Sequence, residues 1–166
     1  MSDRQAGLSL GFLTVLHDAA GYTGGYLVTN AWGRPLEFRL TTPVQPNRVQ
    51  EILYGATLAD YIHTDLIGRT LVDKTTATAT LIVTDTLAVL PLASRISVPV
   101  VAVGGSDAHF VFEHARSTLP LACAEGQAAI EALLANVDAA VDLAEPFARI
   151  RDAVREARTL GMSRAA

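Results

Sequence analysis

Two aspartates follow apolar runs that are expected to form strands. Asp18 ends the run 10–17, and Asp85 ends the run 81–84. If the two strands are neighbours in one sheet, both carboxylates lie at or near carboxyl ends of strands, where open α/β sheets place ligands. Two carboxylates in hydrogen-bonding range would attract Mg²⁺ or Mn²⁺, which suit oxygen ligands. The alternative is that each aspartate accepts hydrogen bonds from nearby backbone N–H groups and caps a turn or a helix.

Glycine and aromatic residues fill the two turns that are expected next. Residues 19–25 carry three glycines where the chain must reverse, and glycine lets backbone or ligand approach closely. Exposed aromatic side chains on loops are common anchors for partners. The expected ligand or partner site consists of Gly21, Tyr22, Gly24, Gly25 and Trp32. The alternatives are a backbone cradle for a phosphate in the first turn and a tryptophan ring folded back over a hydrophobic edge.

Three strands in a row must position these residues. Residues 10–17 are apolar on both alternating faces, which predicts a central strand. Residues 26–29 are rich in β-prone side chains, which predicts the second strand. Leu36, Phe38 and Leu40 alternate with polar residues, which predicts a third strand with these side chains on the core and the others in water. The expected order is therefore central strand, hairpin and half-exposed strand.

A long amphipathic helix is expected after the third strand. Asn47 and Gln50 have the spacing of a capping box, and apolar residues then recur every three or four positions as far as Ile67. Glycine in a helix interior costs about 1 kcal/mol relative to alanine. The pattern therefore predicts either a break near Gly55 or an end near Gly68.

Two further apolar runs predict buried parallel strands, at 81–85 and 98–103. A short crossover between them would place the two strands side by side. Residues 86–96 fit either a short helix or a continuing strand, although Pro91 argues against a central strand.

The last third of the chain predicts a short edge strand and two helices. The edge strand is expected at 109–113, followed by a loop at 116–124. An alanine- and leucine-rich run predicts a helix over 127–143. Proline is favoured in the first turn of a helix and glycine just past its end, so a last helix is expected from Pro146 to Gly161.

Composition limits the broad class of the protein. With 166 residues, half of them hydrophobic, the chain has the size of one α/β domain with a real core. We expect residues 1–7 and 162–166 to be flexible. Only 18% of residues are charged and the net charge is −4, so there is no strong nucleic-acid signature.

The cysteine count and the N-terminal run predict a cytoplasmic location. The single cysteine, Cys123, excludes an intramolecular disulfide and fits a reducing compartment. The N-terminal run is interrupted by glycines, His17 and Asp18, lacks a cleavage-site pattern and is too short to span a bilayer. We therefore expect no membrane association.

The expected order of elements resembles that of ribonuclease H-like domains over about residues 8–103. His17-Asp18 followed by Gly24-Gly25-Tyr26 is similar to the first-strand aspartate and glycine turn of that family. The segment Asn47 to Glu51 resembles the helix start that carries its catalytic glutamate, and Val83 to Thr86 resembles its fourth-strand aspartate. The resemblance implies a mixed sheet with a three-strand antiparallel meander, a long helix and parallel strands. With the two C-terminal helices that the sequence pattern predicts, the expected fold class is a ribonuclease H-like α/β fold.

The same resemblance implies a candidate activity. In that family the acids bind two divalent metal ions for phosphodiester cleavage, so it implies Asp18, Glu51 and Asp85 as catalytic candidates, with Mg²⁺ or Mn²⁺ as cofactor. The residue that aligns best with the family's glutamate is Gln50, which has no carboxylate, and using Glu51 rotates the carboxylate about 100° around the helix. The family's basic substrate handle is also missing.

Three functional hypotheses follow. The first is an α/β binding module with incomplete catalytic acids, which binds a protein or a small ligand through its glycine and aromatic residues. The second is a divalent-metal nuclease or phosphodiesterase that uses Asp18, Glu51 and Asp85. The third is a phosphate binder, similar to part of the sugar-kinase and actin-type ATPases.

Overall fold

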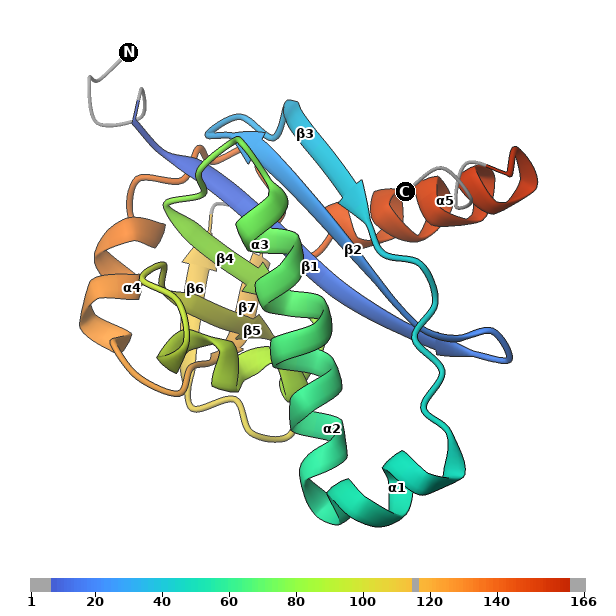
Figure 1. Ribbon diagram of the computed structural model, residues 1–166. Coiled ribbons are helices and arrows are strands. Elements are labelled where there is room, and N and C mark those ends of the chain that lie inside the picture. The colour runs from blue at the N-terminus through green and yellow to red at the C-terminus, as the bar shows by residue number, and fades with distance from the viewer. Residues whose placement is uncertain (1–6, 115–116, 162–166) are drawn as a thin grey trace.

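The computed structural model describes residues 7–114 and 117–161. Its strands form one seven-stranded mixed sheet in the order β3-β2-β1-β4-β5-β7-β6, with helices on both faces (Figure 1). Flexibility is expected for residues 1–7 and 162–166, and of these only Gly7 is among the described residues. That the chain forms a single domain stays a prediction.

The antiparallel meander consists of β1 (Ser9–Asp18), β2 (Gly21–Asn30) and β3 (Pro35–Leu40). The predicted central position of β1 is confirmed, because β1 lies between β2 and β4. Phe12 and Leu13 point to opposite faces of β1, and both are fully buried. A strand that is apolar on both sides thus has a packed layer on each side.

The expected burial of the apolar side chains of β3 is wrong. Leu36 is 56% exposed and Phe38 is 36% exposed, whereas the prediction placed both on the core. Phe38 lies opposite Leu27 and therefore shares its face of the sheet. The helix that covers this face contacts β1 and β2, so the side chains of the edge strand are left partly in water.

The expected position of the first turn is also wrong. Asp18 pairs with Gly21, so only Ala19 and Ala20 reverse the chain, and Gly24 and Gly25 lie inside β2. A side chain at Gly24 would collide with Ile67, and one at Gly25 would collide with Ile150. These two glycines allow helices to approach the sheet closely from both faces.

The parallel strands agree with the prediction. β4 (Leu81–Thr84) pairs with β1, and β5 (Val100–Val103) pairs with β4, both in parallel. The ambiguous connection between them is a 3₁₀-helix, η3 (Leu87–Ser94), which contains Pro91. The crossover is therefore helical.

An antiparallel hairpin extends the sheet beyond β5. The predicted edge strand is confirmed as β6 (Phe110–His114). The loop expected at 116–124 is wrong, because residues Ser117–Ala122 form β7 between β5 and β6. Pro120 does not prevent strand pairing, and its carbonyl accepts a hydrogen bond from the Gly104 N–H at 2.8 Å.

The long amphipathic run forms two helical pieces. α1 (Arg48–Tyr54) begins with the predicted capping box of Asn47 and Gln50, and it ends at Gly55, whose φ is 52°. After a 3₁₀ turn, η1 (Gly55–Thr57), the chain continues through α2 (Leu58–Asp60), the π-helical η2 (Tyr61–Arg69) and α3 (Thr70–Lys74). We refer to residues 58–74 as the long helix. The break near Gly55 is thus confirmed.

The end near Gly68 is wrong, because the long helix continues to Lys74. Gly68 instead allows Leu92 of η3 to pack closely, since a Cβ at Gly68 would lie 3.0 Å from Leu92 Cδ2.

Two helices follow the hairpin. α4 (Gln127–Leu134) ends before the predicted boundary at residue 143. Asp138 and Asp142 accept hydrogen bonds from the N–H groups of Ala140 and Ala144, and such local bonds compete with a helix. α5 (Pro146–Thr159) starts and stops as predicted, with Gly161 just past its end at φ 71°.

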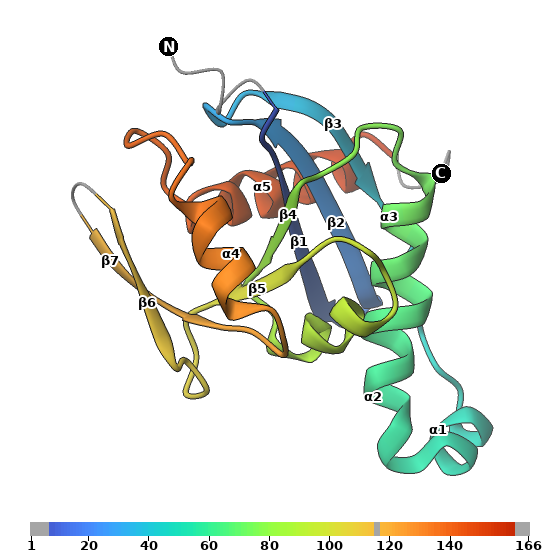
Figure 2. The same cartoon turned by 90° about the vertical axis from the view of Figure 1, so that its left-hand side faces the viewer.

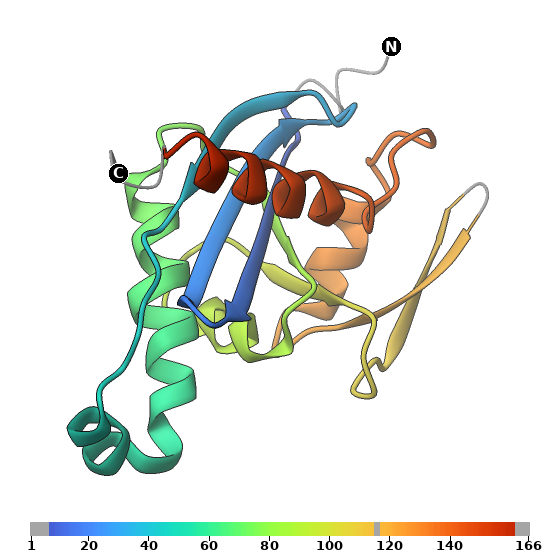
Figure 3. The same ribbon diagram turned by 90° about the vertical axis from the view of Figure 1, so that its right-hand side faces the viewer.

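The sheet separates two hydrophobic cores. On one face α4 and α5 pack on residues such as Phe12 and Leu27 (Figures 2 and 3). On the other face the long helix and η3 pack on residues such as Leu13 and Tyr26. The fold is therefore α/β. The meander, the long helix and the parallel strands follow the order that the resemblance implied, and the two C-terminal helices follow the sequence pattern. None of the helices in the described part of the chain combines the length and apolar character needed to cross a bilayer.

Candidate functional site

Asp18 lies at the end of β1 and holds the last turns of α5. One carboxylate oxygen accepts a hydrogen bond from the Ala20 N–H at 2.9 Å, and the other accepts one from Arg158 Nη1 at 2.7 Å. Arg158 also donates to Thr23 Oγ1 at 2.8 Å. The hydrogen bond from Arg158 is the main reason that the pKa of Asp18 lies below its usual value. The carboxylate is therefore charged and paired.

Asp85 follows β4 and pairs with a second arginine of the same helix. Its carboxylate accepts a hydrogen bond from Thr86 Oγ1 at 3.2 Å and forms an ion pair with Arg151. The side chain of Asp85 is 19% exposed. Arg151 and Arg158 are two helical turns apart and so project from the same side of α5. The two acids thus lie on the face of the sheet that α5 covers.

The structure places the two acids at different levels of the sheet. Leu13 of β1 is level with Thr84 of β4, so Asp85 is level with Thr14, four residues before Asp18. Four residues of strand span about 13 Å, whereas carboxylates that share one Mg²⁺ each lie about 2 Å from it. Within residues 7–114 and 117–161, no three His, Cys, Asp or Glu side chains are grouped as a metal site requires.

Glu51 belongs to a different part of the molecule. It lies in the first turn of α1 and forms an exposed ion pair with Arg48 at 3.2 Å. Figure 1 shows α1 at the far end of the long helix, away from α5. The structure therefore does not bring Glu51 together with the two strand-end acids.

Of the predicted glycine and aromatic residues, some pack against other parts of the chain and one has an exposed side chain. Gly21, at φ 113°, lies against the backbone of Val44, and Gly24 and Gly25 lie under the helices described above. The Tyr22 ring stacks on His17, with centroids 3.9 Å apart, and meets the edge of His63. Trp32 remains 44% exposed in the β2–β3 turn. Of the predicted group, Trp32 has the most accessible side chain, and a contact with a ligand or partner stays a prediction.

Sequence reasoning missed the role of the α5 arginines. Acidic residues are interleaved with the arginines of α5, and Arg155 forms a local ion pair with Asp152 at 3.1 Å. Arg151 and Arg158, however, lie beside the buried stripe that includes Val154 and reach the sheet. Their position next to that stripe was the sequence feature that could have predicted their contact with the sheet.

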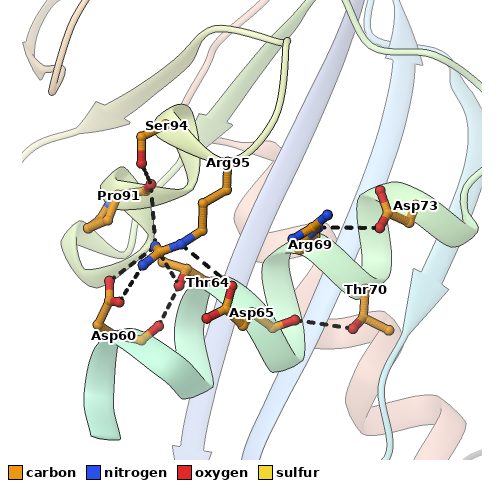
Figure 4. Close-up of polar contacts among 9 residues, drawn as sticks. All are labelled: Asp60, Thr64, Asp65, Arg69, Thr70, Asp73, Pro91, Ser94 and Arg95. Carbon is orange, nitrogen blue, oxygen red and sulfur yellow. Dashed lines mark hydrogen bonds and ion pairs between the residues drawn. The ribbon is translucent and has the colours of Figure 1, made fainter. Parts of the chain in front are cut away.

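A second missed cluster joins the long helix to η3 through Arg95 (Figure 4). Arg95 donates to Asp60 Oδ2 at 2.7 Å and to Thr64 Oγ1 at 2.8 Å, and it lies 3.5 Å from Asp65 Oδ1. The hydrogen bond to Asp60 is the main reason that the pKa of Arg95 is raised. The acids of this cluster are thus used for contacts between elements.

Helix α1 is the most exposed apolar element. None of its residues is buried, and Val49, Ile52 and Leu53 are 62%, 64% and 77% exposed. Their spacing places the three side chains on one side of the helix. Tyr54, at the end of α1, stacks on Tyr61 with ring centroids 4.8 Å apart. This apolar side is available to a partner.

Comparison with known proteins gives structural similarity at low sequence identity. No protein-family model and no curated protein matches the chain. The chain is similar to a protein of unknown function from Archaeoglobus fulgidus, with 12% identity over 78% of this chain and 86% of that one, and a TM-score of 0.48. It is also similar to Marinitoga piezophila Argonaute in complex with 5′ OH guide RNA, with 7% identity over 86% of this chain and a TM-score of 0.42. This chain spans only 27% of the Argonaute, and neither likeness shows a family or an activity.

Proposed function

We propose that this chain is a protein-binding module with a ribonuclease H-like fold, in which Asp18 and Asp85 anchor α5 instead of binding metal ions. The observation that carries the proposal is that each of the two carboxylates is paired with an arginine of α5. Each acid would have to give up that partner before it could ligate a cation. An arginine beside the site would also oppose the approach of Mg²⁺ by charge repulsion.

The binding half of the proposal is supported by α1. Contiguous exposed apolar side chains on a soluble domain mark interaction sites. An amphipathic helix commonly presents such residues to a hydrophobic groove of a partner. Val49, Ile52 and Leu53 form this surface, and Trp32 is a second candidate anchor.

The experiment that tests the proposal is metal titration of wild-type protein, followed by melting temperature, together with a cleavage assay on single-stranded and double-stranded nucleic acid. We expect neither a saturable shift with Mg²⁺ or Mn²⁺ nor cleavage. A ligand at 100 times its dissociation constant would add about 2.7 kcal/mol of stability, which is readily measured.

The alternative function is a metal-dependent phosphodiesterase that uses Asp18, Glu51 and Asp85. Metal-dependent cleavage that disappears in Asp18→Asn and Asp85→Asn but persists in Asp152→Asn would establish it and overturn the proposal. Asp152 is a matched control because it also pairs with an α5 arginine but lies on the exposed side of the helix.

A further inference from the structure

Strand β3 forms a free edge of the sheet. The Thr41 N–H donates to the Gly24 carbonyl at 2.9 Å, and hydrogen-bonded pairs alternate along an antiparallel ladder. With the observed register, Arg39 and Glu37 direct their backbone groups toward β2, and Phe38 and Leu40 direct theirs outward. Among the residues that the structure describes, these outward groups have no backbone partner.

The protection of this edge is confined to its start. Exposed edges are commonly protected by lysine, proline or a β-bulge; β3 begins with Pro35 and has a register shift next to Leu36, whereas residues 37–40 carry neither lysine nor proline. Phe38 is partly exposed on the α5 face, and Leu36, at the register shift, is 56% exposed. On the opposite face, Glu37 and Arg39 form an ion pair at 3.0 Å.

We propose that β3 pairs antiparallel with β3 of a second copy of this chain, around a two-fold axis at Phe38. In this register Phe38 lies opposite Phe38 of the second copy and exchanges two backbone hydrogen bonds with it. Glu37 lies opposite Arg39 of the second copy, and the reverse pair forms by symmetry. The strand is therefore complementary to itself in backbone, charge and apolar side chains.

The helices leave room for this pairing. α5 crosses the sheet at the level of Gly25, which is opposite Leu40, because Ile150 packs on Gly25. The two-fold axis at Phe38 places the second α5 four residues away along the strand, or about 13 Å. Packed helices lie about 8–10 Å apart. The spacing of the two α5 helices along the strands therefore exceeds the distance between packed helices.

The register is tested by cysteine cross-linking in a Cys123→Ser background, which removes the one native thiol. Phe38→Cys places two cysteines directly opposite each other, at about 5.5 Å between Cα atoms, which a disulfide can span. Leu36→Cys is the matched control, since it is at least as exposed but lies more than 10 Å, about four residues, from its counterpart. We expect Phe38→Cys to form covalent dimers on mild oxidation and Leu36→Cys to remain monomeric.

A second experiment uses charge and does not depend on cysteine. Glu37→Arg alone and Arg39→Glu alone each place like charges opposite each other, so both variants should sediment as monomers where wild type sediments as a dimer. Mixing the two variants restores both ion pairs and should restore a mixed dimer. Circular dichroism spectra check that each variant is folded.

Three outcomes would overturn the inference. The first is that the wild type is monomeric at all concentrations. The second is that Leu36→Cys cross-links as readily as Phe38→Cys. The third is that the β3 edge pairs with a strand of another protein while this chain stays monomeric. The inference is independent of the metal and nuclease experiments, which concern Asp18 and Asp85.

Discussion

Helices α5 and α1 show two ways in which this chain places a helix. α5 buries Phe147, Ile150 and Val154 against the sheet, and three of its arginines reach Gly33 O, Asp85 and Asp18. α1 buries nothing and is fixed by a capping box at its start. Asp18 and Asp85 at the sheet thus hold α5 in place. The apolar residues of α1 are exposed because no other described element covers them. The two helices therefore differ in function: α5 stabilises the sheet, and α1 presents an apolar surface.

The largest expected effect is the loss of stability when a buried apolar residue of α5, rather than an exposed one of α1, is replaced by alanine. Phe147 is 2% exposed and meets Phe12 edge to face, with centroids 5.8 Å apart. Phe147→Ala should lower the free energy of unfolding by about 3–5 kcal/mol. Leu53→Ala in α1 should change it by less than about 0.5 kcal/mol. Urea unfolding measures both, and comparable losses would break the contrast between the two helices.

A smaller loss of stability is expected from adding a side chain at Gly25, beneath α5. Gly25→Ala should lower the free energy of unfolding by about 1–3 kcal/mol, because its Cβ collides with Ile150. Shortening the opposing side chain with Ile150→Ala should recover part of this loss in the double variant. If the two losses add, Gly25 does not act through contact with α5.

The smallest stability effect is the pH dependence of the Asp18 ion pair. The hydrogen bond from Arg158 holds the pKa of Asp18 in the folded protein below its usual value of 3.8, so its contribution to stability is present above pH 3.8 and is lost as pH falls below it. The difference in urea midpoint between wild type and Asp18→Asn should therefore shrink as pH falls from 7 toward 3. Asp152→Asn should show a smaller difference at pH 7, and a constant wild-type advantage across this range would contradict the assignment.

The fold was largely predictable because its signals are local. Alternating and continuous apolar runs located β1, β4 and β5, and the Asn47 capping box and Gly55 located α1. The roles of Gly24 and Gly25 were not predictable, because the side chains that cover them, Ile67 and Ile150, are distant in sequence. A glycine that makes a turn and one that admits a helix look alike in isolation.

The candidate site was predictable only in part. Asp18 ends β1 and Asp85 follows the neighbouring β4, so the condition set from the sequence is met, but the levels of the two acids depend on the β1–β4 register. Their partners, Arg158 and Arg151, come from the end of the chain, and local sequence does not show how α5 is rotated on the sheet. The cytoplasmic location stays a prediction.

The most direct test of the central claim is hydrogen exchange of α5 amides in wild type and in Asp18→Asn/Asp85→Asn. If the two acids anchor α5, exchange in α5 should accelerate in the double variant, whereas exchange in α1 should be unchanged. Unchanged α5 exchange in the variant, together with saturable protection of the Asp18 and Asp85 region by Mg²⁺ in wild type, would contradict the account.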